Sequence, residues 1–298
     1  MKSSRLPWYD CLVKPDRISP RDVSVGLDIA VALVLALMSG ALYGITCAPS
    51  ALFGDGGEFQ FVPYILGIAH PTGYPLYVLL GWAWSHLLPA GDVAYRMNLF
   101  SAVTAALAVG CSYPLARRAV LITAPRLSLT AARLAAVTAS LTLTVGTTFW
   151  SQAVIAEVYA LNALFVVLTL LLWLRFVEAP DRRGRGLVLA VVYGLSLAHH
   201  RTMLLLLPGL LLHTVIIRRR GGWRVGRWRD LTAMLMGAIV PLALYLYLPL
   251  RAPHVPYATL PLSDHQTLVL YENSPGGLLD HVTATVFTGY VRLAADAA

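Results

Sequence analysis

Long apolar segments recur along the 298-residue chain, and they limit its possible folds more than any other feature. A helix needs about 20 mainly apolar residues to cross a bilayer. Hydrophobic residues make up 57% of the chain and charged residues 13%, whereas a soluble domain is usually about 25% charged. The sequence therefore excludes a soluble globular protein and predicts an all-α, multi-pass transmembrane protein. The seven expected spans are 23–46, 97–116, 130–149, 155–174, 186–199, 202–217 and 231–250.

The segment 47–96 between the first two spans is also apolar, but glycine and proline interrupt it. Because proline removes a helical hydrogen bond, we expect short helices lying on the membrane surface rather than a crossing. The fifth and sixth spans are short and are joined only by His200 and Arg201. They could form a tight hairpin or one broken pair.

The distribution of positive charge predicts the orientation in the membrane. With the N-terminus in the cytoplasm, the inside segments hold 19 of the 23 lysines and arginines, which is the bias expected for cytoplasmic loops. The net charge of +8 is therefore expected to meet membrane lipids and does not indicate a nucleic-acid partner. The first apolar run is long enough to span, so we expect no cleavable signal peptide. The inside segments are 1–22, 117–133, 175–185 and 218–229.

This orientation places ionisable residues from five segments on the outer face. Such groups are costly at the edge of a bilayer unless they face water, a cavity or one another. A functional site would explain the convergence, although helix ends are polar in any case. The residues are Asp55, Glu58, His70, Asp92, Arg96, Glu157, His199, His200, Arg201 and Arg251.

Asp55 and Glu58 in the run Gly54–Phe59 form the sharpest local pattern. On a helix, residues three apart share a face, and two close acids can divide into a base and an orienting or cation-binding group. The same spacing fits a capping box, with Asp55 as N-cap and Glu58 reaching back. Spacing alone leaves both interpretations open.

The next motif holds His70 and Tyr74 in a turn made rigid by two prolines and a glycine. His70 could hydrogen-bond an anionic leaving group, or both rings could simply lie at the headgroup level. Arg96 and Asn98 then begin the second span. Arg96 could hold a phosphate by a bidentate contact, or it could snorkel to the interface.

Two later segments add candidates for substrate binding. Gln152, Glu157 and Tyr159 flank an outer loop, and Tyr159 could instead be an interfacial anchor. His199 and His200 are adjacent, so on a helix they point about 100° apart and do not suit one metal ion. With Arg201 they are candidates for a phosphate or substrate contact, and the three scattered cysteines suit no metal cluster.

Taken in order, these motifs resemble the branch of the GT-C membrane glycosyltransferases that includes the animal transmembrane protein O-mannosyltransferases. The resemblance covers roughly residues 25–252. It is carried by Gly54–Phe59, His70–Tyr77, Arg96–Ser101, Phe149–Ala153, Ala156–Asn162, Leu197–Thr202 and Tyr247–Arg251.

The resemblance implies an inverting transfer of a mannose-like sugar from a polyprenyl-phosphate donor to a hydroxyl of a protein or glycan acceptor. Asp55 falls on the family's essential outer-loop acid, with Glu58 as its partner. The protein is expected to be an integral membrane protein with its active site on the extracytoplasmic side, in the plasma membrane if the chain is bacterial. Besides the donor, no cofactor is implied with certainty, and a divalent metal remains possible. The implied contacts of the leaving phosphate are His70, Arg96, Arg201 and Arg251.

Members of this family usually continue for several more spans, so the resemblance implies a truncated chain, a fragment or a shortened member. The expected domains are a GT-C-like transmembrane domain at 1–252 and an incomplete outer-loop segment at 253–298. Two other classes stay open. A transporter is disfavoured because the span centres are apolar and no repeat is evident. An inactive relative serving as a membrane scaffold is the second.

Overall fold

A computed structural model describes residues 25–178, 184–219, 228–263 and 266–287. Four helical segments are long and apolar enough to cross a membrane, or five if the bent pair α6 and α7 counts as one span. The predicted all-α, multi-pass class is thus confirmed, and the chain is an integral membrane protein. The four segments are α2 (Val25–Thr46), α5 (Val93–Thr123), α8 (Val158–Glu178) and the run Leu231–His254.

The remaining predicted spans differ from this pattern in informative ways. The third is broken by a 63° bend between α6 (Leu129–Val145) and α7 (Thr147–Ala153). The fifth corresponds to a shorter apolar helix, α9 (Arg185–His199). The sixth corresponds to the short apolar run Arg201–Ile216, which comprises η2 (Arg201–Leu206) and most of α10 (Leu207–Arg219). The number of crossings therefore stays a prediction.

The last long run consists of α11 (Trp228–Ile239), η3 (Val240–Leu246), α12 (Tyr247–Arg251) and η4 (Ala252–His254). It extends past residue 252, where the sequence predicted a domain boundary. That division into domains stays a prediction.

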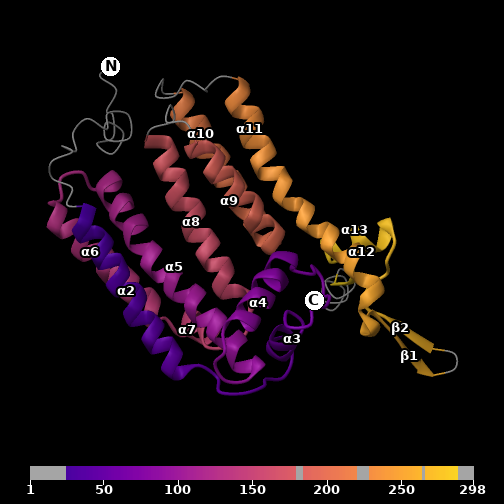
Figure 1. Cartoon of the computed structure of the whole chain (residues 1–298). Coiled ribbons are helices and arrows are strands. Elements are labelled where there is room, and N and C mark those ends of the chain that lie inside the picture. The colour runs from indigo at the N-terminus through magenta and orange to yellow at the C-terminus, as the bar shows by residue number, and fades with distance from the viewer. Residues whose placement is uncertain (1–24, 179–183, 220–227, 264–265, 288–298) are drawn as a thin grey trace, which may run out of the picture.

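Helix α5 is the centre of the bundle and packs against α2, α6 and α8 (Figure 1). Small residues (alanine, serine, threonine and glycine) make up seven of the thirteen buried residues of α5, so neighbouring helices approach closely, as is common in membrane bundles. This packing forms one hydrophobic cluster around Tyr43, Ala105 and Tyr113.

An ion-pair cluster ties together the bundle end at which α2 begins and α5 ends. Asp28 contacts Arg117 at 3.1 Å and Arg133 at 2.9 Å, and it accepts a hydrogen bond from the Tyr113 hydroxyl at 2.7 Å. Arg118 pairs with Glu178 at the same end, where α8 finishes. Arg117, Arg118 and Arg133, which belong to a predicted cytoplasmic segment, thus lie at one end of the bundle, and the assignment of that end to a side of the membrane stays a prediction. Residues 1–22, and the side chains of the basic segment 218–229, lie outside what the structure describes.

The first loop lies at the opposite end, where it forms two short helices, α3 (Asp55–Phe61) and α4 (Pro75–Leu87). The expected short helices are thus present, and their contact with a membrane surface stays a prediction. Proline at the first position of α4 suits a helix start. The following helix α5 begins at Val93 and ends at Thr123, so it is longer at both ends than the predicted span 97–116.

The chain beyond η4 departs from the all-helical pattern. After η5 (Pro256–Ala258), β1 (Thr259–Ser263) and β2 (Gln266–Val269) pair antiparallel, with Thr259 opposite Val269. Figure 1 shows this hairpin projecting away from the bundle. Helix α13 (Pro275–Thr283) and η6 (Thr285–Phe287) follow, and α13 packs back toward the first loop through His281.

Candidate active site

Asp55, Glu58 and His70 gather in one cluster at the start of α3. The Glu58 carboxylate engages His70 twice, because Oε2 lies 2.6 Å from the ring Nδ1 and Oε1 accepts from the backbone N–H at 2.7 Å. One ligand atom from each of the three residues lies within 4.8 Å of the others. Asp55 is exposed, whereas Glu58 and His70 are half-buried. The cluster therefore holds one fixed carboxylate and one that solvent can reach.

The capping-box interpretation of Asp55 and Glu58 is wrong. Gly54 is the N-cap of α3, with φ 66°, and no side chain caps the helix. The Glu58 carboxylate turns instead to the loop that carries His70, since a ring nitrogen and an N–H there satisfy both of its oxygens. That loop lies twelve residues away, beyond the reach of a local spacing rule.

Glu157 adds a third acid beside this pair. It directly precedes α8, and its backbone N–H donates to the Ser101 hydroxyl at 3.2 Å. Burial and then the charge of Asp55 raise the pKa of Glu157 to about 7. A carboxyl with such a pKa can hold or release a proton near neutral pH.

Burial and the neighbouring acids, Glu58 first among them, act on the pKa of His70 in opposite directions. Burial acts to lower the pKa of His70, but the hydrogen bond and charge of Glu58 outweigh it, so this pKa is raised. His70 is thus favoured in its cationic form. A cationic ring beside the acids suits contact with an anionic group.

Aromatic rings form a wall next to the cluster. Tyr74 has a left-handed backbone with φ 44° and is only 9% exposed. Its ring centroid lies 5.4 Å from that of His70 and 5.7 Å from that of His200. Burial raises the pKa of Tyr74 to about 12, so the phenol remains a neutral hydrogen-bonding group. The ring of Tyr159 also belongs to this wall, and its centroid lies 5.9 Å from that of the His200 ring.

The adjacent histidines, both predicted to contact substrate, have separate environments, because α9 ends at His199 and His200 follows it in extended backbone. His199 is fully buried, and its ring stacks against that of Tyr77 with 6.1 Å between the ring centroids. Its Nε2 lies 3.0 Å from the Val158 carbonyl oxygen. It is a core residue at this position. His200 instead faces Tyr74 and Tyr159, and its Nδ1 lies 2.8 Å from the Thr202 hydroxyl.

Side chains of residues 247–281 hold the backbone segment that leads to His70. Five successive carbonyls, from Ile65 to Ala69, each accept a hydrogen bond from a side chain of residues 247–281. We call these side chains the carbonyl clamp. In order, Arg251 Nη2 contacts Ile65 at 3.1 Å, Arg251 Nε contacts Leu66 at 2.6 Å, Tyr247 contacts Gly67 at 2.8 Å, Tyr257 contacts Ile68 at 3.2 Å, and His281 contacts Ala69 at 2.9 Å.

The clamp satisfies backbone groups that no helix or strand provides for. Tyr257 also accepts the Ile68 N–H at 2.8 Å. The fit is close, since a Cβ added to Gly67 would overlap the Tyr257 hydroxyl. His70 therefore owes its place to residues almost 200 positions further along the chain.

Two predicted phosphate contacts lie elsewhere. Arg96 donates to the carbonyls of Ser85 at 2.9 Å, Gly91 at 3.0 Å and Ala90 at 3.3 Å, and so closes the turn after α4. The structure does not bring it to the cluster. Arg251 belongs to the carbonyl clamp, where its guanidinium already has two partners. Arg201 is exposed and donates from Nη1 to the Thr283 carbonyl at 2.6 Å.

Asn98 and Gln152 were also predicted to bind substrate. Asn98 is fully buried and joins three segments, accepting from Gln60 at 2.9 Å and Ala156 at 2.8 Å and donating to Ala48 at 2.8 Å. It holds α3 and the start of α8 in place. Gln152 has a buried Oε1 with no hydrogen-bond partner among the described residues.

Sequence reasoning missed His281, Tyr257 and Gln60. Their contacts join positions far apart in the chain, and no local motif surrounds them. Tyr247 stood in a quoted motif, but nothing in its spacing pointed to Gly67.

Comparison with known proteins agrees with these motifs. The protein O-mannosyl-transferase TMEM260 N-terminal domain family matches residues 55–221. The chain is 31% identical over 232 residues to protein O-mannosyl-transferase TMEM260 of Mus musculus, covering 76% of this chain and 29% of the relative. It is 35% identical over 82 residues to the tmem260 protein of Dictyostelium discoideum, covering 27% of this chain and 10% of that relative.

The chain thus spans less than a third of the length of these curated relatives. No solved structure matches it. The matched region begins at Asp55 and contains His70, Glu157 and His200. With a family match over more than half of the residues, the chain belongs to the protein O-mannosyl-transferase TMEM260 N-terminal domain family.

Proposed function

We propose that this chain is a membrane glycosyltransferase that moves a mannose-like sugar from a polyprenyl-phosphate donor to an acceptor hydroxyl. The observation that carries the proposal is the pair of carboxylates with different surroundings, Asp55 open to solvent and Glu58 held by His70. The names of the relatives support a protein as the acceptor. A glycan acceptor is the alternative.

In the proposed reaction, Asp55 accepts the proton of the acceptor hydroxyl as its oxygen attacks the anomeric carbon. The bond from that carbon to the phosphate oxygen breaks at the same time, and the lipid phosphate leaves with the electron pair. A single displacement of this kind inverts the anomeric centre. Glu58 does not take the proton, because both of its oxygens are already engaged by His70.

The leaving phosphate gains negative charge, which preorganised donors nearby would stabilise. His70 is suited to this role because Glu58 favours its cationic form. His200 and Arg201 lie where α9 ends and η2 begins, with the His200 ring 5.7 Å from that of Tyr74. Tyr74 and Tyr159 would line the path of the sugar.

Asp55, Glu58 and His70 also form a donor set that fits a divalent cation, since two carboxylates and an imidazole lie within 4.8 Å. A bound cation would supply charge for the leaving phosphate. Asp55, Glu58 and His70 are the residues that would hold it.

The proposed location follows from the charge distribution. The acid cluster lies at the bundle end opposite Arg117 and Arg133, which belong to a predicted cytoplasmic segment. The site would therefore face away from the cytoplasm, with the N-terminus inside, and the membrane would be the plasma membrane if the chain is bacterial.

A transfer assay in proteoliposomes tests the proposal. Radiolabelled polyprenyl-phosphate mannose is supplied with membrane extract as acceptor, and wild type is compared with Asp55→Asn. We expect the variant to lose at least about a hundredfold in transfer rate, as is typical when a general base is removed. The matched control is Asp280→Asn, an exposed carboxylate on α13, which should transfer at the wild-type rate.

Equal transfer by wild type and Asp55→Asn would disprove the role of Asp55. Absence of transfer by all three proteins would favour an inactive membrane scaffold for this chain. Retained folding of each variant is checked by its thermal unfolding midpoint in detergent.

A further inference from the structure

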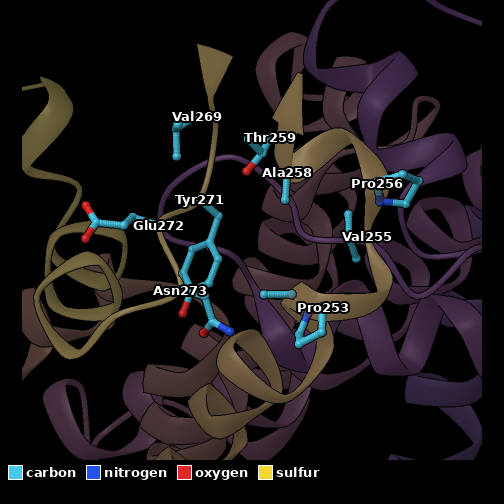
Figure 2. Close-up of a pocket in the computed structure, with 10 residues that line it drawn as sticks. Pro253, Val255, Pro256, Ala258, Thr259, Val269, Tyr271, Glu272 and Asn273 are labelled. Atoms are coloured by element: carbon cyan, nitrogen blue, oxygen red, sulfur yellow. The ribbon is translucent and has the colours of Figure 1, made fainter. Parts of the chain in front are cut away.

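Outside the acid cluster, the segment after α12 lines an open pocket of about 380 Å³. Its walls come from η4, η5, the base of the β-hairpin and the stretch before α13, with Thr259 and Val269 at the ends of the two strands. Figure 2 shows the Tyr271 ring in the middle of this group, between Glu272 on one side and Pro253 on the other. Nothing described so far uses the pocket.

The pocket contains a buried polar group that lacks a partner. Tyr271 is 4% exposed, and its hydroxyl has no hydrogen bond among the described residues. Buried hydroxyls are normally paired, so an unpaired one that lines a pocket points to a missing ligand group. Figure 2 shows this hydroxyl on the same side of the pocket as the amide of Asn273.

The hairpin above the pocket can bind an extended chain. Among the described residues β1 and β2 form a two-stranded sheet, so each strand has an outer edge without a partner strand. Leu262 and Val269 are 63% and 52% exposed. An exposed strand edge with a side-chain pocket at its end is the arrangement that recognises peptides by strand addition.

The charge of the lining indicates which substrate it suits. The one charged residue among the described lining residues is acidic, Glu272, whose carboxylate accepts from the Ser274 hydroxyl at 2.8 Å, and the lining contains neither lysine nor arginine. A phosphate-bearing donor would be repelled there, whereas a neutral or cationic polypeptide would not. We propose that the pocket and the adjoining hairpin form the docking site for the acceptor polypeptide, bound in extended conformation; this rests on the proposed function.

The site lies on the same segment as the carbonyl clamp. The Tyr271 ring meets His281 edge-on at 5.1 Å, and His281 contacts the carbonyl of Ala69, the residue before His70. Tyr257, which precedes β1, holds Ile68 in the same loop. A peptide bound along the hairpin is therefore fixed to the part of the chain that positions the catalytic cluster.

The test uses the whole chain in proteoliposomes and a soluble probe, the capped peptide Lys-Val-Thr-Val-Thr-Val. A photo-crosslinking residue replaces Leu262 on β1, and in a control it replaces Leu37, which is 72% exposed on α2. We expect crosslinking of the peptide at 262 and none at 37. A second control peptide carries proline in place of each valine, so it cannot add a strand and should not crosslink.

The Tyr271 hydroxyl is tested with Tyr271→Phe. Because this hydroxyl has no partner in the protein, its removal should not lower the thermal unfolding midpoint. It should raise the KM for the peptide about tenfold, because the loss of one hydrogen bond weakens binding by about that factor, and it should leave kcat unchanged. Tyr64→Phe, at a phenol outside the pocket, should leave KM unchanged.

Each result separates this inference from the proposed function. Peptide crosslinking at 262 without sugar transfer would support the docking site and contradict the transferase. Transfer without crosslinking at 262, crosslinking between two copies of the chain instead, or a wild-type KM in Tyr271→Phe would overturn the docking site.

Discussion

At the scale of single residues, chemically similar groups of the site have different surroundings. Asp55 and Glu58 share one short helix, yet Glu58 is fixed by His70 and Asp55 remains open to solvent. His199 and His200 are neighbours, yet one is a core residue and the other faces Tyr74. The chemistry available to each group follows from these contacts and not from its residue type.

Glu157 leads to a prediction about pH dependence. Its pKa in the folded protein, about 7, lies above the ordinary value of 4.5 for a glutamate, so folding favours the protonated form. The contribution of Glu157 to stability should therefore be full below about pH 4.5 and be lost as pH rises through 7. Because Glu157 is partly exposed, solvent screening reduces the effect to about 1 kcal/mol.

Glu157→Gln should remove this dependence and make the protein more stable than wild type at pH 8. The measurement is the thermal unfolding midpoint of both proteins in detergent between pH 5 and 8. Parallel curves for the two proteins would contradict the raised pKa.

At the scale of elements, the carbonyl clamp is the main finding. The segment from Ile65 to Ala69 has no regular structure, and side chains from α12, η5 and α13 satisfy its carbonyls one by one. Such an arrangement holds the loop in place, because a carbonyl that is removed from solvent would be costly without its partner. Arg251 contributes to the site through this backbone.

Gly67→Ala tests the clamp. The added Cβ overlaps the Tyr257 hydroxyl, so we expect a loss of about 1–3 kcal/mol in the free energy of unfolding and a lower transfer rate. In the double variant with Tyr257→Phe, removal of the hydroxyl should restore part of that stability. Gly209→Ala is the control, since a Cβ there meets nothing within 4 Å. A stable single variant would show that the loop is not held as described.

At the scale of the whole molecule, the bundle separates two kinds of charge. Asp28 joins Arg117 and Arg133 where α2 begins, and the acid cluster lies where α5 begins. The helices between them expose large apolar side chains, among them Leu37 at 72% and Leu134 at 64%. This exposed apolar belt is suited to lipid.

The orientation is tested by cysteine labelling in intact spheroplasts, on a chain without its native cysteines. Phe53→Cys, before α3, should react with a membrane-impermeant maleimide from outside. Leu127→Cys, between α5 and α6, should react only after the membrane is permeabilised. The reverse pattern would invert the topology and place the site in the cytoplasm.

The sequence alone determined the class of fold and the main elements of the site. Apolar runs of about 20 residues admit few alternatives to membrane helices, and charge at their ends indicates an orientation. Asp55, Glu58 and His70 were found because they stand in local motifs, and the short helices of the first loop followed from its prolines. Each of these signals acts within a few residues.

Tertiary structure decided which groups meet. Whether Glu58 caps α3 or holds His70, and whether Arg96 and Arg251 reach the cluster or backbone carbonyls, depends on contacts between distant segments. The roles of Tyr257 and His281 depend on contacts across about 190 to 210 positions. No periodicity records such pairs, because a hydrogen bond depends on spatial distance and not on separation along the chain.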